Sequence, residues 1–179
     1  MTVQFKDIYE KTQAGLKDTP ENASAVFSVQ TRQIEGFRSE ATVRQFNVTV
    51  DEPEALGGKD TGPTPVELLL AALGSCQEIT YRLYADALGV PLKGVSVELT
   101  GNLDLRGFFA VEPGVRPGYQ SIEATVRLDS TASDEDLARL KETVDKHCPV
   151  LDILASATPV ELKLERGDAA GWQDTWSAA

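Results

Sequence analysis

The sequence predicts an α+β fold in which antiparallel sheets pack around one long buried helix that carries the first cysteine. The apolar period changes along the chain between 3.6 residues, typical of helices, and two, typical of strands. The predicted elements follow one another in the order helix, two strands, helix, two strands, helix and strand. This order differs from the regular alternation of strands and helices that is typical of a parallel sheet. At 179 residues the chain is long enough for one core. We therefore expect a single domain over 1–179, with a helical extension at 1–22 and a tail at 167–179.

The first third of the chain is typical of a helix followed by a hairpin. Apolar residues recur at helical spacing over 2–16. Alternating runs at 25–30 and 43–50, on either side of a turn at 35–38, predict two paired strands. The segment 51–63 is rich in glycine and proline, and we expect a loop that leads into the next element.

The long helix is predicted over 64–88 by its two ends. Thr64 is a good N-cap, Pro65 occupies the first helical position, and Glu67 completes a capping box. Gly89 offers a left-handed C-cap. A stripe at helical spacing is expected to face inward: Leu69, Ala72, Leu73, Cys76, Thr80 and Leu83. Apolar residues on much of the remaining circumference predict a helix buried on most sides.

The second half of the chain predicts three strands and another helix. Alternation indicates strands over 95–99, with an extension toward 105, and over 122–128. The glycine- and proline-containing segment 106–118 between them is expected to be a loop. Ser133 caps a helix whose inward stripe is Leu137, Leu140, Val144 and Cys148. A last strand is predicted over 160–164.

Composition excludes several classes of partner. The net charge of −11 and the pI near 4.5 argue against nucleic acid and against anionic membrane surfaces, which both repel an acidic chain. The N-terminus has no basic region followed by an apolar run, and no apolar run is long enough to span a membrane. We therefore expect a cytoplasmic protein.

The two cysteines are the candidates for chemistry. In a reducing cytosol, Cys76 and Cys148 are not expected to form a permanent disulfide, so core residues, a metal site and a redox pair remain open. Pro149 can begin a short helix that runs to Ala155. Cys148 would then be its N-cap, where the positive helix end favours the reactive thiolate. The plainer interpretation is a small residue that fills a break between helices.

His147 is the only histidine, and a catalytic triad would require it to act as the base. Its side chain is offset by about 100° from that of Cys148 on a continuing helix, so we expect it at the surface. A zinc site built from His147 and the two cysteines would need a fourth ligand and lacks C-x-x-C spacing. We expect neither a metal nor another cofactor.

Two segments, 62–76 with its terminal Gly-Ser-Cys and Cys148-Pro149-Val150, resemble the OsmC/Ohr family of osmotically inducible protein C and organic hydroperoxide resistance proteins. The resemblance covers about 25–166 and implies an intertwined homodimer that reduces organic hydroperoxides at the subunit interface. It implies that Cys76 is the peroxidatic thiolate and that Cys148 resolves its sulfenic acid as a disulfide. An external dithiol would then restore both thiols.

A buried thiolate needs a nearby cation, because desolvation alone would keep it protonated. The resemblance implies an arginine near the tip of the first hairpin. Arg38 matches best, with Arg32 and Arg44 as alternatives, and a solvated surface charge is the plainer interpretation of Arg38. The resemblance also implies a glutamate where this chain has Val66.

The alternative function is a non-catalytic dimeric module that binds a small apolar ligand.

Overall fold

The computed structural model describes residues 5–166, so the predicted tail at 167–179 lies outside the described residues. It divides the chain into two units. The first comprises the chain up to Val26 together with Thr64–Ala155, and the second comprises Phe27–Pro63 with the chain after Ala155. The predicted α+β character and antiparallel pairing are confirmed, with strands in two separate sheets.

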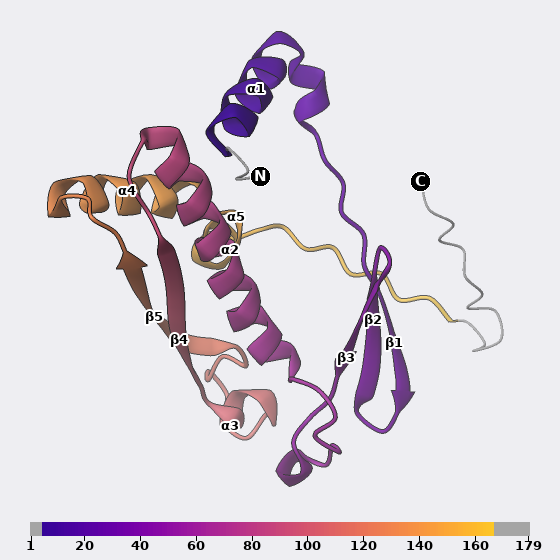
Figure 1. Cartoon of the computed structure of the whole chain (residues 1–179). Coiled ribbons are helices and arrows are strands. Elements are labelled where there is room, and N and C mark those ends of the chain that lie inside the picture. The colour runs from indigo at the N-terminus through magenta and orange to yellow at the C-terminus, as the bar shows by residue number, and fades with distance from the viewer. Residues whose placement is uncertain (1–4, 167–179) are drawn as a thin grey trace. The chain divides into compact units, whose positions relative to one another are not determined.

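The predicted long helix is α2, Pro65–Leu88, and it runs through the first unit (Figure 1). Both ends form as the sequence predicts. The Glu67 backbone N–H donates to the Thr64 hydroxyl at 3.3 Å, and the Thr64 N–H donates to the Glu67 carboxylate at 2.7 Å. Gly89 ends the helix with a left-handed φ of 69°, a conformation that glycine adopts without steric cost.

The face that α2 buries differs from the predicted stripe. Leu69 and Ala72 remain exposed, so the expected burial on most sides is wrong for the first turns of the helix. The residues that are buried lie from the third turn onward: Leu73, Gly74, Gln77, Thr80, Tyr81 and Ala85. Gly74 permits a close approach of the strand beneath it, because a Cβ there would lie 2.9 Å from Leu99 Cδ1.

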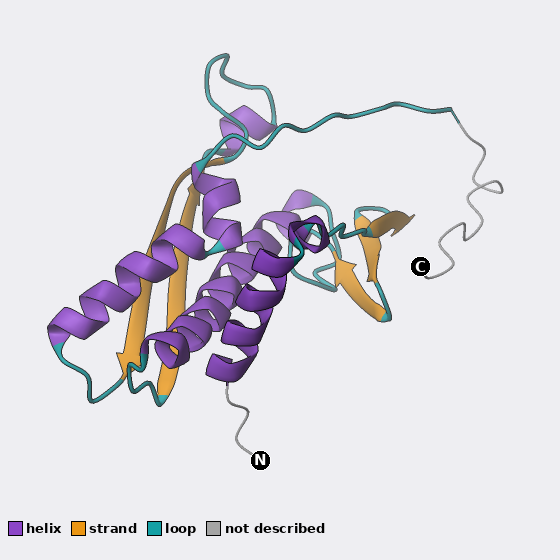
Figure 2. Cartoon of the chain, turned by 90° about the horizontal axis from the view of Figure 1, so that it is seen from above, coloured by secondary structure: helices purple, strands orange, loops and turns teal. Residues whose placement is uncertain are grey.

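The first unit packs α2 against a two-stranded ribbon and other helices (Figure 2). Strands β4, Gly94–Leu103, and β5, Tyr119–Asp129, pair antiparallel with Val97 opposite Val126. Helix α4, Asp134–His147, packs against α2, as does the shorter α5, Pro149–Ala155. The core consists of buried residues from α2, from α4 and from the connection that follows α2: Tyr81, Ala85, Val90, Leu140 and Val144.

The N-terminal helix α1, Phe5–Asp18, agrees with the helix predicted over 2–16 and is followed by a 3-10 turn, Pro20–Ala23. It contacts α2, where the ring of Tyr9 meets the ring of Tyr84 edge-on with centroids 5.7 Å apart.

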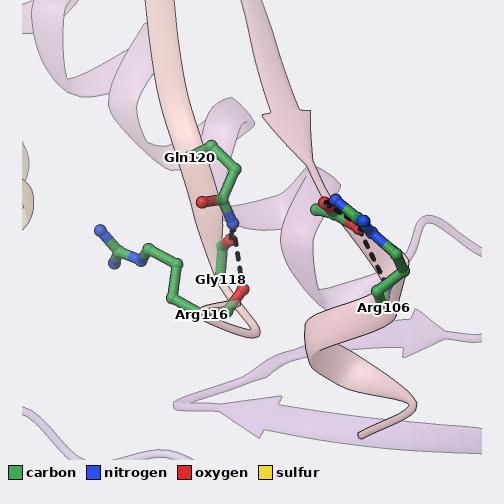
Figure 3. Close-up of polar contacts among 5 residues, drawn as sticks. Arg106, Arg116, Gly118 and Gln120 are labelled. Atoms are coloured by element: carbon green, nitrogen blue, oxygen red, sulfur yellow. Dashed lines mark hydrogen bonds and ion pairs between the residues drawn. The ribbon is translucent and has the colours of Figure 1, made fainter. Parts of the chain in front are cut away.

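The predicted loop at 106–118 contains one short helix, α3, Leu105–Phe108. Arg106 forms an ion pair with Asp104 at 2.6 Å and holds the start of this helix (Figure 3). On the returning chain, the Gln120 amide donates to the carbonyls of Arg116 and Gly118, each at 3.0 Å. The excursion is therefore an ordered connection between β4 and β5.

The second unit holds a three-stranded meander where we expected a single hairpin. Its strands are β1, Gln30–Glu35, β2, Arg38–Val43, and β3, Phe46–Val50. The predicted turn at 35–38 is correct, since Glu35 pairs with Arg38 around Gly36. A second reversal follows Val43 at Arg44, whose φ is 54°. This reversal splits the strand predicted over 43–50.

Two predicted strand segments are not strands in the part of the chain that the structure describes. Residues 25–29 precede β1, and residues 160–164 follow α5 without a pairing partner. Both segments are largely exposed, with Phe27 at 91% and Leu162 at 90%. Strand pairing needs an adjacent edge, which neither segment has within the described chain.

The loop after β3 is organised by one buried carboxylate. Asp51 is 1% exposed and accepts hydrogen bonds from the N–H groups of Glu52, Lys59 and Thr61 and from the Thr61 hydroxyl. The Thr61 hydroxyl and these backbone donors lower the pKa of Asp51 to about 2. The loop includes the 3-10 turn η2, Glu54–Leu56.

Within residues 5–166, no helix combines the length and apolar character needed to cross a membrane.

Candidate functional site

The two cysteine sulfurs meet in the first unit. Cys76 lies midway along α2, and Cys148 lies at the junction of α4 and α5. The Cys148 thiol donates to Cys76 Sγ across 3.3 Å, although 72 positions separate the two residues in sequence. Cys148 is 1% exposed, whereas Cys76 remains partly accessible. The pair therefore joins a buried thiol to one that a small molecule can approach.

The local sequence fixes Cys148 in this position. Its backbone N–H donates to the Val144 carbonyl at 2.9 Å and closes the last turn of α4. Pro149 then begins α5, as predicted, because proline lacks the N–H that a continuing helix would use. The predicted inward stripe of α4 is confirmed at Leu140 and Val144, which are both 0% exposed. Burial of that stripe directs Cys148 toward α2.

Burial raises the pKa of the Cys76 thiol, and the neighbouring Cys148 thiol adds to that shift. Two donors act in the opposite direction, the backbone N–H of Val150 and the hydroxyl of Thr80. The first unit alone therefore favours the neutral thiol of Cys76. A reactive thiolate requires a further positive charge.

These two donors were not identified from the sequence. We expected the start of α5 to act on Cys148, whereas its free backbone N–H at Val150 serves Cys76. The signal for Val150 is its place in the first turn of a helix, where N–H groups have no intrahelical acceptor. The signal for Thr80 is its spacing of four residues from Cys76.

His147 is exposed, as predicted, and its ring packs on Tyr84 with centroids 5.1 Å apart. Its Nδ1–H donates to the Thr143 carbonyl at 2.7 Å. Both contacts hold the imidazole on the surface of α4 and α2 rather than on a sulfur. Among residues 5–166, no three histidine, cysteine or acidic side chains gather as a metal site would require.

The three candidate arginines belong to the second unit. Arg38, the first residue of β2, is half-buried, and its Nε is buried without a hydrogen-bond partner in the described chain. Arg44 is exposed and lies over the Phe46 ring at 5.3 Å, and Arg32 is exposed on β1. Arg38 is therefore the one of the three with an unused buried donor.

A surface depression of about 490 Å³ lies at the end of β4 beside α3. Neither cysteine contributes to its lining, which consists of Asn102, Leu103, Asp104, Leu105 and Gln120. It is open to solvent, and it is distinct from the sulfur pair.

Comparison with known proteins gives one family match. The family model for OsmC-like protein matches residues 58–163, which is more than half of the chain and includes both cysteines. A search of curated protein sequences finds no significant match.

Solved structures of similar fold include proteins of this kind. An OsmC-like protein from Mycoplasma pneumoniae aligns with a TM-score of 0.65 at 21% identity, over 75% of this chain and 90% of that one. An organic hydroperoxide resistance protein OsmC from Legionella pneumophila aligns with a TM-score of 0.54 at 18% identity, over 73% and 91%. An organic hydroperoxide resistance protein from Elizabethkingia anophelis gives 0.55 at 16% identity, over 72% and 89%.

Proposed function

Because this chain belongs to the OsmC-like protein family, we propose that it is a thiol-dependent peroxidase that reduces organic hydroperoxides. Structural relatives that are named organic hydroperoxide resistance proteins support the substrate class. The observation that carries the proposal is the 3.3 Å contact between the sulfurs of Cys76 and Cys148. That distance suits a pair of thiols that exchange a bond during turnover.

In the proposed cycle, the Cys76 thiolate attacks one peroxide oxygen and the O–O bond breaks. The sulfur becomes a sulfenic acid, and the other oxygen leaves as an alkoxide that takes up a proton to become an alcohol. Cys148 then attacks the Cys76 sulfur, so an S–S bond forms while the sulfenic oxygen leaves as water. An external dithiol supplies two electrons and two protons and restores both thiols.

Activation of Cys76 is assigned in this proposal to Arg38. Burial raises the pKa of Cys76, so a guanidinium is needed to make the thiolate form near neutral pH. The buried, unpaired Nε of Arg38 supports this assignment, because a thiolate would satisfy it. Glu67 is occupied by the capping box, so it does not replace the carboxylate that is missing at Val66.

We also propose that the active form is a homodimer in the cytoplasm. Val26 and Phe27 are 90% and 91% exposed, and Leu162 and Leu164 are 90% and 100% exposed. Apolar side chains in alternating, strand-like segments are stabilised when a second copy covers them. Phe27→Asp and Leu164→Asp are expected to shift the protein toward monomer in light-scattering measurements, whereas Leu105→Asp is the surface control. An unchanged mass for both variants would contradict the proposed interface.

The direct test of the cycle separates its two thiols. With hydroperoxide and a dithiol, the wild type is expected to turn over and Cys76→Ser to be inactive. Cys148→Ser is expected to accumulate a sulfenic acid that dimedone labels at Cys76. Dimedone labelling of Cys148 in Cys76→Ser, together with no labelling of Cys76 in Cys148→Ser, would reverse the assignment of roles.

The second candidate is a non-catalytic dimeric module that binds a small apolar ligand. The raised pKa of Cys76 and the apolar Val66 favour it. It predicts that Cys76 alkylation requires alkaline pH and that Arg38→Met leaves this pH dependence unchanged. The peroxidase instead predicts alkylation below neutrality that Arg38→Met abolishes and Arg38→Lys partly retains.

A further inference from the structure

We propose that Thr80 is a hydrogen-bond donor to the reacting sulfur, and that its hydroxyl turns from the Cys76 carbonyl to Cys76 Sγ when the thiol loses its proton. This inference rests on the proposed function and deepens it, because it adds a residue to the same site. The donor comes from α2 itself, one turn beyond the cysteine.

The geometry places one hydroxyl beside two acceptors. Thr80 and Cys76 are four residues apart on α2, so their side chains are neighbours on one face of the helix. Thr80 Oγ1 donates to the Cys76 carbonyl at 2.7 Å. The Cys76 sulfur is also within reach of this hydroxyl, which lowers the pKa of the thiol. Thr80 is only 5% exposed, so bulk water competes little for its hydrogen.

The preference between the two acceptors depends on the charge of the sulfur. A neutral thiol is a weak acceptor, so the hydroxyl bonds to the carbonyl. A thiolate is a charged acceptor, and a hydrogen bond to it is roughly twice as strong as one between neutral groups. When the hydroxyl turns, the Cys76 carbonyl keeps the backbone N–H that the α-helical ladder provides. The change therefore leaves no buried carbonyl unsatisfied.

The surroundings of Cys76 leave Thr80 as the donor that a substitution can remove. The titratable group that faces the sulfur is the Cys148 thiol, from the junction of α4 and α5. The other donor, from α5, is the backbone N–H of Val150, which side-chain substitution does not eliminate. The charge proposed for Arg38 would act together with both donors.

Thr80→Val tests the inference, because valine keeps the branched shape and loses the hydroxyl. The rate of Cys76 alkylation by iodoacetamide is measured against pH in the reduced full-length protein, with the Cys76 peptide quantified by mass spectrometry. Thr80→Val is expected to raise the pH at which the alkylation rate reaches half of its maximum by about one pH unit. Below that midpoint, alkylation of the variant is then about tenfold slower. Thr80→Ser keeps the donor and is expected to titrate like the wild type.

Midpoints that coincide in the wild type and Thr80→Val would overturn the inference. If Thr80→Val fails to fold by circular dichroism, Thr80→Ala removes the same hydroxyl with a good helix former, and the same comparison applies. The titration requires no peroxide, so the two proposals fail separately. A wild type that ignores hydroperoxide overturns the peroxidase and not the donor role of Thr80, whereas an unshifted Thr80→Val in an active enzyme overturns the donor role alone.

Discussion

Oxidation of the two thiols is expected to stabilise the chain against unfolding by about 4 kcal/mol. The magnitude follows from the 72 positions that separate Cys76 and Cys148, because a cross-link over a loop of that length removes conformational entropy from the unfolded chain. The sulfurs are already 3.3 Å apart, and a covalent bond needs about 2.05 Å, so closure requires only a small movement. Little native strain should therefore offset the gain.

The assay compares thermal unfolding of reduced and peroxide-oxidised protein at one protein concentration, because association also shifts the midpoint. For a chain of this size, about 4 kcal/mol corresponds to a rise in Tm of roughly 10 °C. Cys148→Ser carried through the same treatment should show no rise. An oxidised wild type whose disulfide is verified by mass, but which melts no higher than the reduced form, would refute the reasoning, since closure would then distort the native packing.

Three further predictions concern the scaffold. Leu140→Ala should lower the free energy of unfolding, measured in urea, by about 3 kcal/mol, because Leu140 is 0% exposed. The exposed control Leu105→Ala should change it by less than about 1 kcal/mol. Equal losses in the two variants would contradict the assignment of Leu140 to the core. Thr64→Ala should lower the free energy of unfolding by about 1 kcal/mol and Thr64→Ser by much less, because serine also caps the helix; equal losses in the two variants would show that the capping hydroxyl is not the source of the loss. The pKa of Asp51 is lowered from 3.8 to about 2, so its contribution to stability is complete above about pH 4 and is lost as pH falls toward 2. Acid unfolding curves of the wild type and Asp51→Asn should therefore differ in that window, and parallel curves would contradict the role of the carboxylate.

The parts of the fold that sequence analysis predicted are those with local signals. Thr64 and Glu67 define the start of α2 within one turn, and Pro149 forces the break that places Cys148. The contact between the two sulfurs follows from inward stripes on two helices. Cys148 could therefore be assigned to a packed face before the structure was known, whereas Cys76, expected on such a face, remains partly accessible.

The parts that were wrong depend on partners that a local pattern does not contain. The stripe at Leu69 and Ala72 is helical in period, yet no described element covers it. The alternating segment 160–164 has the pattern of a strand, but no strand edge lies beside it within residues 5–166. The missed reversal at Arg44 did leave a signal, because Val43 and Phe46 fall out of phase with a period of two.

The central claim is that one hydroperoxide oxidises both thiols of one chain, and intact mass spectrometry tests it most directly. Reduced protein is treated with a limiting, stoichiometric organic hydroperoxide, and then denatured and alkylated. The account predicts loss of two hydrogens per chain, no alkylation at Cys76 or Cys148, and no such change in Cys76→Ser. A wild type that keeps both thiols free after this treatment would contradict the account.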